Sequence, residues 1–465
     1  MLAAAPDAPL PPVPAPLSRR TKLAYGMGDL GAAVVTTITG FFLTAFLLDV
    51  VGLRPGLVGV IFLISQLWDA LIDPPIGLLT DRTRSRWGRK RPWLLWGALP
   101  FGVAYVLHWV VPPLGQTGLF VYYLLVSLLL RTAYSAVNIP YAALAADLTQ
   151  DYNERTRLTT YRFSFSIFGG LLAAIGHPIL VGLGGENAAL GNVISAAFWG
   201  VFIVLTVLAA FRWTYEPPVT AAVSNEKRDG LYTQIRQCFQ NRPFLLVTGI
   251  YLFSWLALLL IQNNLLLYVR YWANAEDAFP TILVTFQVSA ILFLSVWSRL
   301  SVRLGKREVY VLGVGLWVAT IVALFFIPQG MLTPYYAVAF FGGAGAAVAY
   351  LIPWSMLPDV VEYDTIQTGQ RREGLFYGMF VLMQQAGLSL GLAGSSFALE
   401  AAGYLTPSAG QAITQPPAVL TTLRVLVSLA PAVILLCSIP LALRYPLTRE
   451  RFTEIQRQAR ERQGN

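Results

Sequence analysis

Twelve apolar stretches, each about long enough to cross a lipid bilayer, recur along the 465-residue sequence and restrict its fold more than any other feature. A helix needs about 20 residues to span the hydrocarbon core. The backbone N–H and C=O groups can all form hydrogen bonds there only in helices and closed barrels. Hydrophobic residues make up 56% of the chain and charged residues 12%, unlike a soluble domain. We therefore predict an all-α membrane protein. The expected spans are residues 24–49, 56–79, 92–112, 118–146, 159–183, 189–211, 243–271, 279–299, 309–328, 333–357, 375–402 and 418–443.

Lysine and arginine are distributed unevenly among the connections between these spans. With the N-terminus inside, 28 of the 33 basic residues lie in cytoplasmic segments, as the positive-inside rule requires. We therefore expect a multi-pass protein of the plasma membrane, the inner membrane of a bacterium, with both termini cytoplasmic. The net charge of +9 follows from this distribution and does not indicate a nucleic-acid partner.

Two halves of the sequence carry the same loop pattern. Gly88-Arg89-Lys90 follows the second span of the first half, and Gly305-Lys306-Arg307 follows the second span of the second half. Such a parallel repeat predicts two pseudo-symmetric six-helix bundles. The expected organisation is a disordered N-terminus (1–20), the N-terminal bundle (21–212), a cytoplasmic linker (213–242), the C-terminal bundle (243–445) and a basic cytoplasmic tail (446–465).

Two carboxylates, Asp69 and Asp73, interrupt the second apolar stretch. Four residues make one helical turn, so both acids share a face. An ionised aspartate inside a membrane costs several kcal/mol, and such residues mark ion pathways or pair with bases. The sequence therefore predicts a cation or proton site; the alternative is a pair of acids locked by arginines, which only holds helices together.

Further polar stripes lie on neighbouring spans and should converge on one water-filled cavity. They comprise Tyr25 and Asp29 in the first span, Arg131, Ser135 and Asn138 in the fourth, and Arg162 in the fifth. If all groups are ionised, three aspartates face two arginines, which leaves one excess negative charge. One cation or one proton would neutralise it.

The second half offers neutral polar groups and aromatic rings in its spans. They are Gln262, Asn263 and Asn264, then Trp354, and then Gln384 and Gln385. Amides beside aromatic faces suit an uncharged polyhydroxylated ligand. For any one of these residues, hydrogen bonding between helices is an equal alternative.

Charged groups at the cytoplasmic ends of the spans predict a gate. We expect Asp359, Glu362 and Asp364 to pair with the arginines of the loop after the second span, such as Arg82 and Arg86, when the cytoplasmic side is shut. Asp81 in the same loop is counted with the gate.

No metal or redox site is predicted. His108 and His177 fall near extracellular span ends without a ligand cluster, so we expect them at the membrane interface. The two cysteines, Cys238 and Cys437, suggest no disulfide framework. We find no nucleophile-base pair and no phosphate loop in the sequence, so we do not expect an enzyme.

Several motifs together resemble the glycoside-pentoside-hexuronide cation symporters of the major facilitator superfamily. The match covers nearly the whole chain. Its motifs are Tyr25-Gly26-Met27-Gly28-Asp29, Trp68-Asp69-Ala70 with Asp73-Pro74, the loop Asp81 to Trp93, Asn138-Ile139-Pro140-Tyr141 and Asp359-Val360-Val361-Glu362-Tyr363.

The resemblance implies cation-coupled uptake of a sugar-like solute by alternating access, with a coupling ion, H+ or Na+, and no other cofactor. It implies cation binding by Asp69, Asp73 and Ser135. It also implies that Asp29 and Arg162 bind substrate, with Asn138 and Gln385 standing where the family has a charged sugar ligand and a lysine. Ile72 replaces an amide between the two acids, which favours the proton as much as sodium.

Two other functions remain open. Lysophospholipid transporters share the acids of the second span, and a non-transporting membrane sensor could use the same fold. The expected partners are a small sugar-like molecule, a monovalent cation or proton and the lipid bilayer, and we expect a monomer.

Overall fold

The computed structural model describes residues 17–149, 152–216, 236, 238–368, 373–406 and 414–447, and these residues form helices joined by short loops. Most of the predicted N-terminal segment (1–20), linker (213–242) and tail (446–465) lies outside the described residues. The helices are α1 (Arg19–Ala45), η1 (Phe46–Val50), α2 (Pro55–Arg82), α3 (Arg91–Leu107), α4 (Gln116–Leu148), α5 (Tyr152–Gly182), α6 (Ala188–Trp213), α8 (Arg242–Tyr271), η2 (Glu276–Ala278), α9 (Phe279–Leu304), α10 (Lys306–Phe325), α11 (Leu332–Thr368), α12 (Glu373–Ala401), α13 (Pro417–Arg424), η3 (Val425–Leu429) and α14 (Ala430–Leu443).

These helices supply the twelve predicted spans and confirm the all-α membrane fold. Helix α1 continues into η1, and α13, η3 and α14 also form one span. Eleven helices of the described chain have the length and apolarity needed to cross a membrane. The twelfth span is α3, which is only 17 residues long. The largest boundary difference is in α11, which continues to Thr368, well beyond the predicted end at residue 357, because its polar last turns leave the apolar run.

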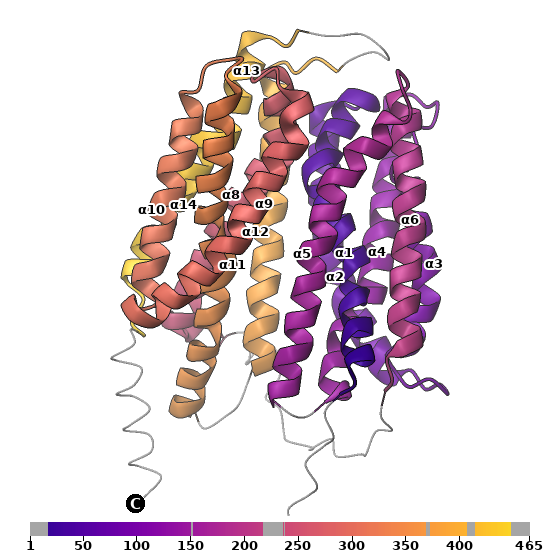
Figure 1. The fold of residues 1–465 in the computed structure, drawn as a ribbon, viewed down its shortest axis with the longest axis vertical. Coiled ribbons are helices and arrows are strands. Elements are labelled where there is room, and N and C mark those ends of the chain that lie inside the picture. The colour runs from indigo at the N-terminus through magenta and orange to yellow at the C-terminus, as the bar shows by residue number, and fades with distance from the viewer. Residues whose placement is uncertain are drawn as a thin grey trace, which may run out of the picture.

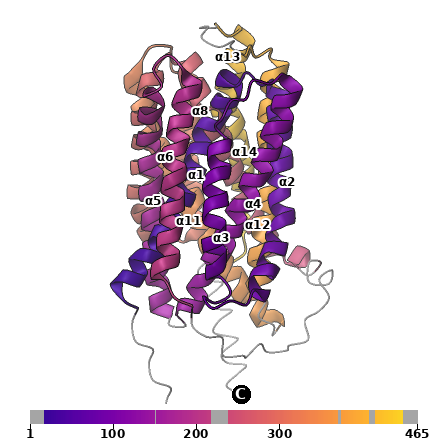
Figure 2. The same cartoon turned by 90° about the vertical axis from the view of Figure 1, so that its right-hand side faces the viewer.

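The helices form two bundles that stand side by side, α1 to α6 and α8 to α14 (Figure 1; Figure 2). Three helix pairs join them: α1 with α8, α2 with α12, and α5 with α9. The second helix of each bundle thus meets the fifth helix of the other, as a parallel repeat requires. We call the end where α1 begins and α14 ends the terminal side, and the end with η1 and η2 the far side (Figure 1).

A glycine brings the two bundles together where α2 crosses α12. A Cβ atom at Gly59 would lie 3.0 Å from the Cβ of Ser396 and 3.1 Å from the carbonyl oxygen of Ala393. A larger residue would push α2 away from α12, so this glycine sets how closely the second span approaches the other bundle.

The loop repeat has a structural counterpart on the terminal side. Gly88 and Gly305 have φ angles of +100° and +99°, which favour glycine. The Lys90 Nζ lies 2.7 Å from Asp147, and the Lys306 Nζ lies 2.6 Å from Asp359. Each Nζ also donates to the backbone carbonyl four residues before its acid, at 2.8 and 2.6 Å. Equivalent lysines therefore anchor equivalent helices, which supports the internal repeat.

The two histidines lie near the far-side ends of their helices and are buried there. His108 is the C-cap residue of α3 and His177 belongs to the last turns of α5, and both side chains are buried within the N-terminal bundle. Ser127 Oγ lies 3.1 Å from the Nε2 of His108, and Ser195 Oγ lies 2.8 Å from the Nδ1 of His177. A serine hydroxyl of a neighbouring helix therefore contacts each imidazole, whereas the Nδ1 of His108 is buried without a hydrogen-bond partner among the described residues.

Candidate functional site

The two acids of α2 face a matching pair on α4. Arg131 Nη1 lies 2.8 Å from Asp69 Oδ2, and Ser135 Oγ donates to Asp73 Oδ1 at 2.6 Å. Both pairs are separated by one helical turn on their own helix, so two packed helices produce two parallel contacts. The structure therefore brings the three predicted cation-site residues together, with Arg131 beside them.

One oxygen of Asp69 has no hydrogen-bond partner among the described residues. This oxygen, Oδ1, is buried, while Oδ2 binds Arg131. An unsatisfied carboxylate oxygen is expensive to bury, and Asp69 lies near the middle of the 28-residue helix α2. Asp73, one turn away, has a hydroxyl donor but no cationic partner in the described part of the chain. The pair therefore offers carboxylate oxygens and an excess negative charge to a cation or a proton.

A second acid-base pair lies between α1 and α5. Arg162 Nε lies 3.1 Å from Asp29 Oδ1, and its guanidinium lies 5.2 Å from the centroid of the Tyr141 ring. Tyr141 stacks on Tyr25, with centroids 4.8 Å apart. Arg162 retains donors beyond the one that binds Asp29, because a guanidinium has five. This cluster combines an aromatic surface with hydrogen-bond donors and acceptors. Asn138 lies half-buried on α4, three residues after Ser135.

The predicted aromatic residue of the C-terminal bundle belongs to a cluster of rings. Trp354 is 39% exposed and lies edge-on to Tyr251 and Phe380, with centroid distances of 5.8 and 5.6 Å. The Tyr251 hydroxyl donates to Gln384 Oε1 at 2.9 Å. Gln385, the next residue of α12, is half-buried. The exposed ring of Trp354 leaves a face on which a ligand could stack.

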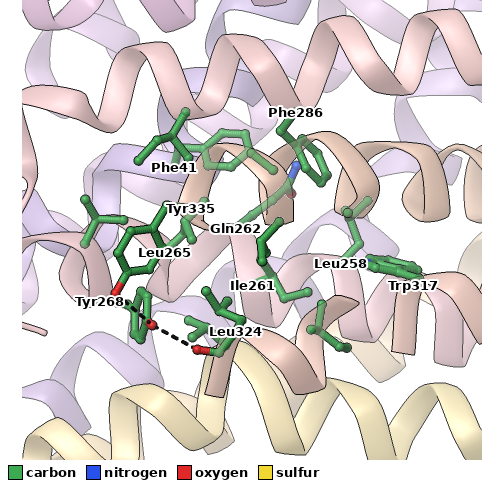
Figure 3. Close-up of a pocket in the computed structure, with 17 residues that line it drawn as sticks. Phe41, Leu258, Ile261, Gln262, Leu265, Tyr268, Phe286, Trp317, Leu324 and Tyr335 are labelled. Carbon is green, nitrogen blue, oxygen red and sulfur yellow. Dashed lines mark hydrogen bonds between the residues drawn. The ribbon is translucent and has the colours of Figure 1, made fainter. Parts of the chain in front are cut away.

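The three consecutive amides of α8 occupy different environments. Gln262 lines an apolar pocket together with Phe41, Phe286 and Trp317 (Figure 3). Asn263 accepts a hydrogen bond from Thr44 of α1 and so joins the bundles. Asn264 is fully buried and donates to the Leu260 carbonyl of its own helix at 2.8 Å. Of the three amides, Gln262 is the one that lines this pocket.

The predicted gate residues lie on the terminal side in separate bundles. Asp81, Arg82 and Arg86 are exposed, and they line one hollow at the end of α2. Asp359 pairs with Lys306 of its own bundle at 2.6 Å, and Glu362 is exposed.

A charged cluster that the sequence analysis missed closes the far side. Arg270 of α8 forms an ion pair with Asp49 of η1, and Tyr404 donates to the other oxygen of Asp49. Glu276 pairs with the same arginine. We call Asp49, Arg270, Glu276 and Tyr404 the far-side latch. In sequence each acid or base stands near a span end, where charges are common, so no local signal marks the cluster.

Two bundles of six helices, with buried acids at mid-membrane, define a polytopic membrane transport protein of the major facilitator type. Residues 24–449 match the family described as MFS/sugar transport protein, and the chain belongs to this family.

Individual relatives agree with this membership. An uncharacterized symporter of Synechocystis sp. is 37% identical, over 96% of this chain and 97% of the relative. A sodium-dependent lysophosphatidylcholine symporter of Danio rerio is 29% identical, over 93% of this chain and 86% of the relative. Among solved structures, a bacterial homologue of the human lysosomal transporter Spinster in an inward-facing, occupied conformation has a TM-score of 0.67 at 15% identity. That alignment covers 91% of this chain and 95% of the Spinster homologue, and it shows the shared fold.

Proposed function

We propose that the protein is a cation-coupled secondary active symporter that carries a sugar-like solute, such as a glycoside or oligosaccharide, by alternating access. The observation that carries the proposal is the buried, unpartnered Oδ1 of Asp69 beside Asp73, which has no cationic partner among the described residues. The family description and the symporter names of relatives support it.

Coupling follows from the charge balance of the N-terminal bundle. Asp29 and Asp69 each face an arginine, whereas Asp73, among the described residues, faces a serine and no base. One bound cation or proton neutralises the remaining charge. A neutral, loaded site can change its exposure more easily than a charged one, because a net charge inside a membrane is costly. The coupling ion is H+ or Na+, and Asp69, Asp73 and Ser135 hold it.

Substrate binding is assigned to the two aromatic clusters. Arg162, Asp29 and Asn138 offer donors and acceptors to hydroxyl groups, and Tyr25 and Trp354 offer ring surfaces. Asp29 and Arg162 each lie ten residues from the terminal-side start of their helix, and Tyr251, which contacts Trp354, lies nine residues from the start of α8. The two clusters are therefore at a similar depth.

The orientation follows from charge. We assign the terminal side to the cytoplasm because the basic loops around Arg82 to Arg91 and Arg303 to Arg307 lie there. In the described residues, the hydrogen bonds and ion pairs between the bundles lie towards the far side. The structure is therefore assigned to an inward-facing state, and the gate of Asp81, Arg82 and Arg86 with Asp359 and Glu362 forms in the outward-facing state.

A proteoliposome uptake screen tests the proposal. Purified protein is reconstituted and offered labelled sugars and glycosides, with a sodium gradient in one set and a pH gradient in the other. Accumulation above the external concentration, driven by either gradient, is expected. Failure to accumulate any glycoside under both gradients would contradict the assignment to sugars.

One observation favours a second candidate substrate, a lysophospholipid or related amphiphile. The pocket beside Gln262 is lined almost wholly by apolar side chains, among them Leu258, Ile261 and Phe286 (Figure 3), and such a surface suits an alkyl chain. The relative from Danio rerio is named for such a substrate. Lysophosphatidylcholine in the same screen decides between the two candidates.

A further inference from the structure

Gln287 of α9 lies where the two bundles meet, eight residues from the start of its helix. A Cβ atom at Gly170 of α5 would lie 3.3 Å from the Oε1 of Gln287 and 3.1 Å from the Oγ1 of Thr37 on α1. Three helices therefore meet at this point. They contribute the amide of Gln287, the hydroxyl of Thr37 and the backbone of Gly170. The glycine leaves space there that any other residue would fill.

The amide nitrogen of Gln287, Nε2, is buried and has no hydrogen-bond partner in the described part of the protein. Buried amide donors are almost always paired, and Gln287 lies between two helices that must separate during transport. A donor left unpaired at such a place is available to a ligand that arrives between the bundles.

A second amide of the C-terminal bundle faces α1. The Oε1 of Gln262 is 3.7 Å from the position that a Cβ atom would take at Gly40. In Figure 3 its side chain points toward Phe286, the residue that precedes Gln287. Gln262 thus faces Gly40 of α1, and Gln287 faces Gly170 of α5, beside Thr37 of α1. Both amides of the C-terminal bundle therefore stand opposite a glycine of the N-terminal bundle.

We propose that Gln287 and Gln262 form an amide subsite that hydrogen-bonds uncharged hydroxyl groups of the transported solute. An amide donates and accepts, so each one matches a hydroxyl group, which does the same. The subsite rests on the proposed symport function, and it adds Gln287 as a specificity-determining residue. It is separate from the cation site, which is built by α2 and α4.

Isothermal titration of the full-length protein in nanodiscs tests the subsite. The probes are the 4-nitrophenyl glycosides of glucose and galactose at saturating sodium, and sodium alone. Gln287→Met keeps the length of the side chain and removes its hydrogen bonds. We expect about tenfold weaker glycoside binding, the usual effect of losing a neutral hydrogen bond, with sodium affinity unchanged. Wild-type glycoside affinity in this variant would overturn the subsite.

Two further variants make the result specific. Thr285→Val is the matched control, because the Thr285 hydroxyl donates to the Thr281 carbonyl of its own helix at 2.8 Å; its glycoside affinity should equal that of the wild type. Gly170→Ala fills the space opposite Gln287 and should weaken glycoside binding in the same direction, which keeps the test valid if Gln287→Met does not fold. If the wild type binds neither glycoside, the proposed sugar function fails, and the subsite falls with it.

Discussion

Two buried aspartates, Asp69 and Asp49, differ in how many of their carboxylate oxygens have a hydrogen-bond or ion-pair partner. Their side chains are similarly exposed, at 9% and 6%, and each pairs with an arginine. Both oxygens of Asp49 have partners, Arg270 and Tyr404. Only one oxygen of Asp69 has a partner, and the other is buried without one in the described residues.

This difference distinguishes a candidate ion-binding site, at Asp69, from a contact that joins the two bundles, at Asp49. The Asp69 contact lies within one bundle, so rocking of the bundles leaves it intact. The Asp49 contact joins the bundles and must break when the far side opens. An ion pair between the bundles, with a partner on every oxygen, stabilises the one conformation in which it can form. A carboxylate oxygen that lacks a partner inside a single bundle can bind an ion in either conformation.

The largest effect is expected at the cation site. Asp73→Asn removes the excess negative charge, so gradient-driven accumulation should fall at least a hundredfold while counterflow, which needs no net coupling, persists in part. Uptake by proteoliposomes measures both. Full gradient-driven accumulation by this variant would contradict the role of Asp73 in coupling.

The next effect concerns the far-side latch. Arg270→Gln leaves Asp49 buried without its cation, and breaking a buried pair costs about 3–5 kcal/mol. The far side should therefore open. Spin labels on Arg54 and Asp277, exposed residues of the two bundles, should report a longer mean distance, and cation affinity should remain unchanged.

A neutral double variant sharpens that test. Asp49→Asn with Arg270→Gln removes both charges and should restore part of the closed population. An unaltered distance distribution in the single variant would show that the latch does not hold the bundles together.

A smaller effect is expected at Ser135. Its hydroxyl donates to Asp73 at 2.6 Å, and Ser135→Ala should weaken the apparent cation affinity by roughly tenfold, as for a hydrogen bond to a charged group. Substrate affinity at saturating cation should not change. Thr132→Val is the control, since Thr132 Oγ1 accepts from the indole of Trp68 on the same pair of helices. Equal cation affinity in the wild type and Ser135→Ala would exclude Ser135 from the site.

The smallest effect involves an ion pair outside both clusters. Lys22 donates to Glu154 and, as the main cause, holds the pKa of that carboxyl below its usual value. A lowered folded-state pKa gives stability that is present above the unfolded pKa and is lost as pH falls through the folded pKa. Lys22→Gln should therefore lower the Tm slightly at pH 7, and this difference should vanish in acid. Arg157→Gln, which removes a more exposed partner of Glu154, should change the Tm less; a difference independent of pH would contradict the assignment.

The sequence predicts what depends on local composition. The spans follow from apolar runs, and Asp69 and Asp73 stand out because charges inside such runs are costly. The far-side latch escapes prediction because Asp49 and Arg270 are 221 residues apart and meet only when the bundles pack. Gln287 escapes because a single amide in an apolar run equally suggests contact between helices. The burial of His108 and His177 escapes prediction because their serine partners lie on other helices.

The central claim is that Asp69 and Asp73 bind the coupling cation. Charge movement on solid-supported membranes tests it most directly, because rapid jumps of sodium or pH need no knowledge of the substrate. We predict a transient current for the wild type after at least one of the two jumps, and none for the Asp69→Asn, Asp73→Asn double variant. A current of undiminished size in the double variant would contradict the claim.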